Sequence, residues 1–150
     1  MKLRVVWITP KPRSKEPAYD ALTREYIARI SNYQPIEASD VPTEAALLGL
    51  IERAQGRTTP LLVLLDGRGK QVTSEEFAAF IQAQQAAGVQ QLIFAIGPAD
   101  GFGDGARGVA SKILALGKMT LPHELARVVL LEQIYRAFTI LRGHPYHCGH

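Results

Sequence analysis

The sequence predicts an α/β fold with a mainly parallel sheet flanked by helices. Apolar strand-like runs alternate with segments whose apolar residues recur every three or four positions, an order typical of βαβ units. The runs Leu61–Leu65 and Gln91–Ile96 are almost wholly apolar, as expected of parallel strands buried on both faces. A length of 150 residues, 47% of them hydrophobic, suits one domain with a substantial core. We therefore expect a single domain over residues 1–150.

The first part of the chain predicts two strands and the beginning of a helix. Leu3–Ile8 is rich in β-branched residues and ends at a Thr-Pro step, and residues 34–39 form a weaker strand pattern. Asp40 as an N-cap and Pro42 as an early helical position predict a helix over residues 43–54.

A tyrosine-rich helix is expected from Ala18 onward. Its larger side chains are spaced three or four apart, at Tyr19, Leu22, Tyr26, Ile30 and Tyr33. Such a stripe suits either a base-stacking platform or a core face with hydroxyl groups at its rim. We favour the core face.

The overall charge is mildly basic. The formal net charge is +3 and the sequence pI is about 9.2, which permits a phosphate-rich partner but does not require one. Lys11, Arg13 and Lys15 form the densest basic group, in a Pro-rich loop. This loop is either simply solvated or contacts an RNA backbone.

A capping box marks a helix in the middle of the chain. Thr73 and Glu76 have the spacing at which each side chain bonds the other residue's backbone, and the helix runs to about Ala87. A glycine-rich loop and a short helix, roughly 105–111, follow the strand Gln91–Ile96. The residues from Ile113 to Leu116 are expected to form another short strand.

The longest helical pattern begins at Pro122 and ends at Gly143. Proline suits a first helical position because its missing N–H would be unpaired there. The apolar face is wide and comprises Leu125, Val128, Val129, Leu131, Ile134, Tyr135, Phe138 and Ile140. So wide a face suggests contacts on more than one side, and we expect it to form a homodimer interface.

Several classes of protein are disfavoured. The one cysteine, Cys148, excludes an internal disulfide framework and fits a reducing compartment. No apolar run approaches the ~18 residues that a membrane span needs, and the N-terminal apolar stretch is too short for a signal core. We expect a cytoplasmic protein with no membrane partner.

Three loops follow the predicted strands, where open α/β sheets bind ligands. They are Asp66–Lys70, Gly97–Gly105 and Gly117–Leu121. Asp66 directly follows a buried strand, and it either caps the turn, pairs with Lys70, or acts in catalysis. The turn role is favoured.

Gly103, Gly105 and Gly108 formally match the dinucleotide fingerprint G-x-G-x-x-G. The match is weak, because the fingerprint turns tightly off its strand whereas six residues separate Ile96 from Gly103. No acidic residue ends a following strand about 20 residues later. We favour glycines that permit close backbone approach.

The C-terminal tail contains possible metal ligands. His144, His147, Cys148 and His150 lie within seven residues at the end of the sequence, whereas structural zinc sites usually take their ligands from two separated pairs. We expect no metal site and attribute the last residues to a frayed polar tail.

Five blocks together resemble one known family. They are Leu65-Asp66-x-x-Gly69-Lys70 with Thr73–Ala78, Phe94–Gly97 through Asp100-Gly101, Met119–His123, Glu132-Gln133-x-Tyr135-Arg136-Ala137, and His144–His147. In order and spacing they closely resemble the RlmH family of the SPOUT superfamily, over essentially the whole chain.

The resemblance implies an S-adenosylmethionine-dependent methyltransferase acting on N3 of a pseudouridine in 23S ribosomal RNA, within the large subunit or the assembled ribosome. It further implies a SPOUT-type domain with a C-terminal trefoil knot, and a homodimer whose cofactor is held in the knot loops. A non-catalytic RNA- or ribosome-binding dimer on the same fold is the alternative. From the pattern alone, a small nucleotide-binding α/β enzyme is a third hypothesis.

Carried onto this chain, the resemblance assigns two groups of residues. The cofactor-binding group is Leu65, Gly97, Gly101, Leu116, Gly117, Lys118, Met119, Thr120 and Leu121. The catalytic candidates are His144, Tyr146, His147 and Arg142, and Arg136 either assists them or only pairs with Glu132. Where the family commonly has a second glycine, this chain has Pro98, which has no N–H to offer a cofactor.

Overall fold

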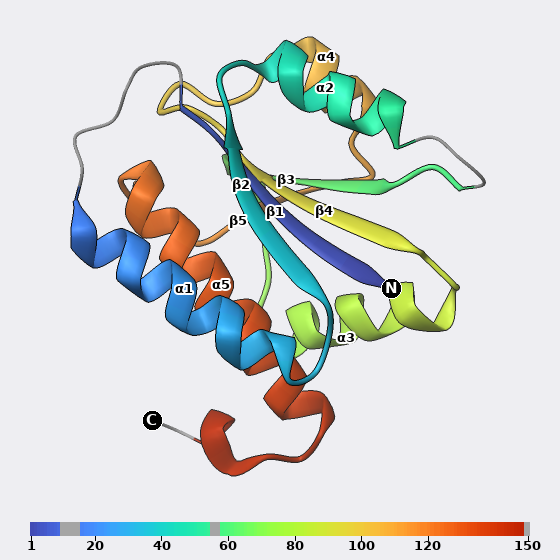
Figure 1. The fold of residues 1–150 in the computed structure, drawn as a ribbon, viewed down its shortest axis with the longest axis vertical. Coiled ribbons are helices and arrows are strands. Elements are labelled where there is room, and N and C mark those ends of the chain that lie inside the picture. Colours follow the sequence, from blue (N-terminus) through green and yellow to red (C-terminus); the bar gives the residue numbers. More distant parts are fainter. Residues whose placement is uncertain (10–15, 55–57, 149–150) are drawn as a thin grey trace.

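The structure, a computed structural model, describes residues 1–9, 16–54 and 58–148 and contains a five-stranded sheet (Figure 1). The spatial order is β2-β1-β4-β3-β5. The strands are β1 (Lys2–Ile8), β2 (Ile36–Val41), β3 (Leu61–Gln71), β4 (Gln91–Ile96) and β5 (Lys112–Ala115). Each neighbouring pair in the described residues is parallel, which confirms the predicted α/β class with a parallel sheet.

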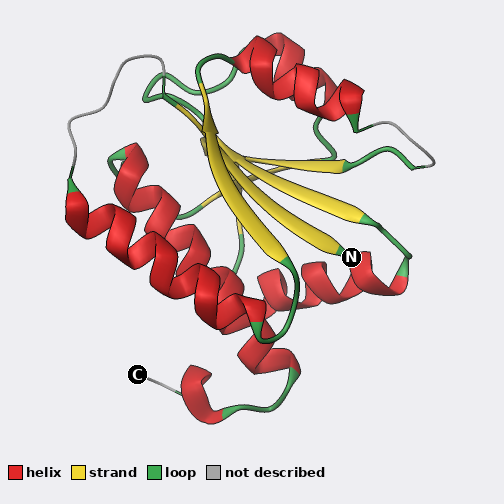
Figure 2. Ribbon diagram, viewed as in Figure 1, coloured by secondary structure: helices red, strands yellow, loops and turns green. Residues whose placement is uncertain are grey.

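Helices cover both faces of the sheet (Figure 2). Those on one face are α1 (Pro17–Ser31), α3 (Ser74–Ala86) and α5 (His123–Leu141), and those on the other are α2 (Glu44–Arg53) and α4 (Asp104–Val109). A short 3-10 helix, η1 (Pro145–His147), follows α5. Among the described residues, no helix is both long enough and apolar enough to cross a membrane.

Strand β1 contributes to two hydrophobic cores. Val5 and Trp7 lie in the core beneath α1, α3 and α5, whereas Val6 and Ile8 lie in the core beneath α2 and α4. All four side chains are buried, because successive residues of a strand point to opposite faces and both faces are covered. This explains the uninterrupted apolar runs in the sequence.

A buried arginine joins α5 to the sheet. The Arg127 side chain is fully buried, and its guanidinium lies 4.2 Å from the centroid of the Trp7 ring. It also forms an ion pair with Asp20 of α1 at 3.4 Å. The aromatic face and the carboxylate offset part of the cost of burying a charge.

The tyrosines of the first helix region take part in packing. Tyr26 and Tyr33 are partly buried against the core, and the Tyr33 ring stacks on Phe138 with centroids 6.0 Å apart. Leu22 is an exception, because 38% of it is exposed. The basic residues Lys11, Arg13 and Lys15 lie outside the described residues.

The helix signals were partly right. The predicted capping box is confirmed, since the Thr73 hydroxyl accepts from the Glu76 N–H at 3.1 Å and the Glu76 carboxylate accepts from the Thr73 N–H at 3.0 Å. The predicted N-cap Asp40 is wrong. Thr43 caps α2, accepting from the Ala46 N–H at 3.1 Å, because β2 continues to Val41 and keeps Asp40 paired with β1.

Strand β3 is longer than predicted. The sequence suggested a loop after Leu65, but the strand runs to Gln71. Both Leu65 and Lys70 pair with Leu114 of β5, so the register shifts between them. A Cβ at Gly69 would lie 2.6 Å from the Leu114 carbonyl carbon, so only glycine lets the two backbones approach this closely.

The wide apolar face of α5 is used within the chain. This helix packs between α1 and α3, and its fully buried residues include Leu130, Leu131 and Ile134. The width of the face therefore does not by itself require a second chain. The helix begins at His123, one residue later than predicted, with Pro122 as its N-cap residue, and Gly143 follows the helix end with a φ of +68°.

Candidate functional site

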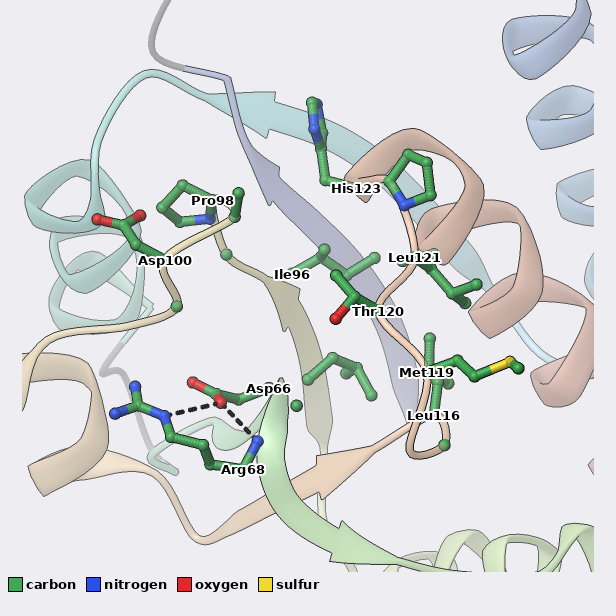
Figure 3. Close-up of a pocket in the computed structure, with 18 of the residues that line it drawn as sticks. Asp66, Arg68, Ile96, Pro98, Asp100, Leu116, Met119, Thr120, Leu121 and His123 are labelled. Carbon is green, nitrogen blue, oxygen red and sulfur yellow. Dashed lines mark hydrogen bonds and ion pairs between the residues drawn. The ribbon is translucent and has the colours of Figure 1, made fainter.

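A pocket of about 700 Å³ lies beyond the carboxyl ends of the strands. Three segments line it, residues 65–68, 96–101 and 116–123, together with Ala126. Figure 3 shows Pro98 and Asp100 on one side of the pocket and Thr120 and Leu121 on the other, with Asp66 at its edge. The volume suits a small-molecule ligand. All nine residues of the cofactor-binding group assigned from the sequence lie in this lining.

The loop after β4 is a tight turn. The Gly101 N–H donates to the Pro98 carbonyl at 2.8 Å, so Pro98 contributes through its C=O although it has no N–H. Gly101 has a φ of +84°, and a Cβ there would lie 2.8 Å from Oδ2 of Asp66. A Cβ at Gly97 would lie 2.9 Å from the Phe102 ring. Both glycines are therefore required by close contacts.

Asp66 joins three segments beside the pocket. Its Oδ1 accepts from the Arg68 N–H at 2.9 Å and from Arg68 Nε at 3.4 Å. Its Oδ2 accepts from Arg107 Nη2 at 2.5 Å and from the Phe102 N–H at 3.4 Å. Asp66 bonds the N–H two residues on, but the turn predicted there does not form, because β3 continues to Gln71. Its ion-pair partners are Arg68 and Arg107, not Lys70.

The environment keeps Asp66 ionised. Burial of the carboxyl raises its pKa, but the hydrogen bonds from Arg68 and Phe102 and the charge of Arg107 outweigh burial, so the pKa of Asp66 is lowered. The carboxylate can therefore accept hydrogen bonds at both oxygens.

The loop between β5 and α5 forms the opposite wall. Gly117 has a φ of +155°, a conformation that other residues rarely adopt, and a Cβ there would meet nothing within 4 Å. Its backbone therefore borders open space in the pocket. Met119 is 84% exposed, and Lys118 and Thr120 are also exposed.

The glycines of the formal dinucleotide fingerprint have a different partner. The N–H groups of Gly103 and Ala106, at the beginning of α4, donate to the carboxylate of Glu44 at 2.7 and 3.3 Å. An anionic side chain from α2 therefore occupies the helix terminus that a phosphate would need. This arrangement argues against a nucleotide site built on the fingerprint.

Two of the C-terminal candidates, Tyr146 and Arg136, contact the Glu132 carboxylate. Tyr146 donates its hydroxyl to Glu132 Oε1 at 3.0 Å, and Arg136 Nη2 donates to the same oxygen at 2.6 Å. The Tyr146 ring packs edge-on against Tyr135, with centroids 4.7 Å apart. Burial and the hydrogen bond to Glu132 raise the pKa of Tyr146, so this hydroxyl keeps its proton at neutral pH. The predicted Arg136–Glu132 pair is confirmed.

The remaining tail candidates are more open. His144 is exposed, and its Nδ1 accepts from the Tyr146 N–H at 3.2 Å. His147 is half-buried and lies beside the exposed Cys148, with Nε2 and Sγ 3.8 Å apart. Arg142 is exposed, with its guanidinium carbon 5.6 Å from the centroid of the Tyr33 ring.

The two groups of candidate residues lie at opposite ends of α5 (Figure 1). The pocket lies at the beginning of this helix, at His123, whereas the tail follows its end and folds back, so that Tyr146 contacts Glu132 and Tyr135 in its second half. Glu132 is nine residues beyond His123, which is ~14 Å along the helix axis. One chain therefore does not bring its own cofactor candidates and its tail candidates together.

Sequence reasoning missed part of the site. Arg68 and His123 line the pocket, and Arg107 holds Asp66 from outside it. The position of Arg68 just beyond a buried strand was a signal that could have included it. Arg107 lies 41 residues from Asp66 in sequence, and no local pattern could have linked the two.

Comparison with known proteins places this geometry in a family. A family model described as "Predicted SPOUT methyltransferase" matches residues 1–147. Ribosomal RNA large subunit methyltransferase H from Koribacter versatilis is 57% identical over 150 residues, covering 100% of both chains. The protein of the same name from Geotalea uraniireducens is 43% identical over 155 aligned positions, covering 98% of this chain and 99% of that protein.

A solved structure shares the fold. The SpoU methyltransferase AviRb from Streptomyces viridochromogenes matches with a TM-score of 0.55 at 16% sequence identity, covering 95% of this chain. This chain spans only 61% of the AviRb chain, and the likeness concerns the fold alone. The match of the family model and the full-length identity with the two relatives show that this chain belongs to the SPOUT methyltransferase family, in the group of ribosomal RNA large subunit methyltransferase H.

Proposed function

We propose that this chain transfers a methyl group from S-adenosylmethionine to N3 of a pseudouridine in large-subunit ribosomal RNA, in the cytoplasm. One observation carries the proposal. The three segments that the family resemblance assigns to the cofactor line one pocket of about 700 Å³. Membership of the family and the names of the full-length relatives support the same activity.

The pocket fits the proposed cofactor chemically. Leu65, Ile96 and Leu121 give it apolar surface, which suits an adenine ring and a methylene chain. The backbone at Gly117 borders open space, so a ligand can approach it closely. S-adenosylmethionine, when bound, supplies an electrophilic methyl group. The three segments that line the pocket hold and orient the reactants, and orientation provides a large part of the rate of such a displacement.

The tail supplies groups for the RNA side of the reaction. The acceptor N3 has to lose a proton, and the imidazoles of His144 and His147 are the candidate bases. Tyr146 keeps its proton because its pKa is raised, and it donates this proton to Glu132, which fixes the phenol within the tail. Arg142 is exposed and can pair with an RNA phosphate or a developing uracil anion.

We infer that the working unit is a homodimer in which the tail of one chain completes the pocket of the other. The separation of ~14 Å along α5 between His123 at the pocket and Glu132 at the tail cluster supports this arrangement. In a two-fold dimer each partner makes the same contacts. If the two α5 helices cross antiparallel, the end of each lies near the beginning of the other. Each tail then lies beside the partner's pocket, and the dimer contains two complete sites.

Methyl transfer to ribosomes tests the reaction. Ribosomes and isolated large subunits from cells that lack this methylation are incubated with the protein and tritiated S-adenosylmethionine. We expect tritium in the large-subunit RNA, at N3 of one pseudouridine when the RNA is digested and analysed by mass spectrometry. Binding of both cofactor and ribosomes without transfer would instead support a non-catalytic ribosome-binding dimer.

Mixing two inactive variants tests the shared site. One variant carries Gly117→Val, which damages the pocket, and the other ends at Gly143, which removes the tail. If pocket and tail come from different chains, co-refolded mixtures regain methyl transfer, because a heterodimer contains one complete site. A mixture of two different pocket variants is the matched control. No recovery in the first mixture, when heterodimers are present, would overturn the shared site.

A further inference from the structure

Asp66 and Arg107 hold both backbone groups of a single residue in the loop after β4. The Phe102 N–H donates to Oδ2 of Asp66 at 3.4 Å. The Phe102 carbonyl accepts from Arg107 Nε at 3.1 Å. Arg107 Nη2 also donates to Oδ2 of Asp66 at 2.5 Å. The three groups form a closed network that joins β3, the loop and α4.

The network is sheltered from solvent. The side chain of Asp66 is 3% exposed and that of Arg107 is 25% exposed. The Phe102 ring is buried, and its edge packs against Gly97 at the other end of the loop. Partly desolvated, charge-assisted hydrogen bonds of this kind are stronger than exposed ones.

The network fixes a wall of the pocket. Residues 96–101 line the pocket, whereas Phe102 and Arg107 stand behind this wall and are not part of the lining. The loop is closed at its tip by the Gly101–Pro98 hydrogen bond and at its base by Phe102. Because the loop is held at its tip and at its base, it loses little conformational entropy when a ligand binds.

We propose that Asp66 and Arg107 are a positioning pair that presets the 97–102 loop for S-adenosylmethionine, so that their network acts on cofactor affinity through the loop. Neither residue is assigned a chemical step. The inference rests on the proposed function, because it concerns the same pocket. A loop released from Phe102 would have to be ordered by the cofactor, and affinity would fall by the cost of that ordering.

Two substitutions of Arg107 separate positioning from general stability. Arg107→Lys keeps the charge beside Asp66, but one ammonium group cannot reproduce the fork that reaches both Asp66 and the Phe102 carbonyl. Arg107→Gln removes the charge as well. Arg4 provides a matched control, because its side chain is 21% exposed and its Nε lies 3.6 Å from Glu37, near the amino end of β1. The controls are Arg4→Lys and Arg4→Gln.

The measurements are calorimetric binding of S-adenosylmethionine to the unaltered chain and to each variant, and the KM for the cofactor against kcat. We expect the cofactor Kd and KM to rise about threefold in Arg107→Lys and tenfold or more in Arg107→Gln. At saturating cofactor, kcat should stay within twofold of the unaltered chain. Both Arg4 variants should bind as the unaltered chain does, whatever their melting temperatures.

The possible outcomes are distinguishable. Failure of the unaltered chain to bind S-adenosylmethionine would refute the proposed function itself. If the unaltered chain binds S-adenosylmethionine and both Arg107 variants bind it equally well, only the positioning pair is refuted. A loss of kcat with an unchanged KM in these variants would refute it too. If Arg107→Gln does not fold, Arg107→Lys decides, with the cofactor-induced rise in melting temperature as the second measurement.

Discussion

The side chain of Tyr146 shows how a single residue is prepared for a task. Its ring is held by Tyr135 and by the guanidinium of Arg136, 5.1 Å from its centroid, and its hydroxyl is bound to Glu132. A group with so many partners has one orientation. In the proposed dimer, that orientation fixes the phenol, and the tail around it, on the RNA side of the partner's pocket.

Replacing this hydroxyl tests its role. Tyr146→Phe keeps the ring contacts with Tyr135 and Arg136 and removes the hydrogen bond to Glu132. We expect an unchanged Kd for S-adenosylmethionine and a fall in kcat of about tenfold or more, on the scale of losing one hydrogen bond to a charged group. Single-turnover methylation of ribosomes measures it. An unchanged rate would restrict Tyr146 to a packing role.

The backbone of Gly101 makes a second prediction at this scale. Gly101→Ala has to adopt a φ of +84° and would bring its Cβ to 2.8 Å from Asp66 Oδ2. We expect a loss of stability of about 1 kcal/mol or more and weaker cofactor binding. Gly108→Ala is the matched control, since a Cβ there meets nothing within 4 Å. Equal behaviour of the two variants in urea denaturation would contradict the strain argument.

The lowered pKa of Asp66 predicts how the stability of the fold changes with pH. A carboxyl whose folded-state pKa lies below its unfolded value stabilises the fold above the unfolded value, near ~4, and this contribution is lost as pH falls through the folded value. The charged groups facing Asp66 are Arg68 and Arg107. We therefore expect the stability difference between the unaltered chain and Asp66→Asn to shrink from pH 7 to pH values below ~4. If this stability difference instead grew as the pH falls, the prediction would be wrong.

At the scale of elements, the loop between β5 and α5 depends on Gly117. Its φ of +155° is disfavoured for any residue with a Cβ. Because the space around that Cβ is open and belongs to the pocket, a substitution acts by straining the backbone path and by placing a side chain in the pocket. Gly117→Val should abolish most of the rise in melting temperature that S-adenosylmethionine produces in the unaltered chain. A full rise in the variant would place the cofactor elsewhere.

Local patterns predicted the elements better than they predicted their connections. The alternating runs and the Thr73–Glu76 box identified strands and helices, because burial patterns and capping depend on residues that are close in sequence. The continuation of β3 beyond Leu65 was missed, since Asp-Gly-Arg-Gly-Lys has the composition of a turn and only pairing with β5 makes it a strand. The N-cap at Thr43 depended on where β2 ends.

The sequence predicted which residues form the two groups of the candidate site, but not how these groups lie relative to each other. Strand ends and the family resemblance assigned nine pocket residues, and all nine line the pocket. The Asp66–Arg107 contact and the separation of the pocket from the tail depend on how distant segments pack. The trefoil knot and the single domain remain predictions.

At the scale of the molecule, the separation of pocket and tail predicts assembly. One chain has a mass of 16.4 kDa, and we expect twice that mass in sedimentation equilibrium at micromolar concentration. The chain that ends at Gly143 should remain dimeric if α5 and its neighbours form the interface, and should bind S-adenosylmethionine within a few-fold of the full chain. A monomeric full chain would remove the basis for a shared site.

The packing of Arg127 over Trp7 has a practical consequence. The sequence contains one tryptophan and one cysteine, and the first is buried beneath a guanidinium near the sheet's carboxyl edge while the second is exposed at the tail. An acceptor dye on Cys148 would therefore allow resonance energy transfer to be measured from Trp7, the only indole donor in the sequence. Energy transfer between differently labelled chains would report the approach of one chain's tail to the other's sheet without any engineered label site.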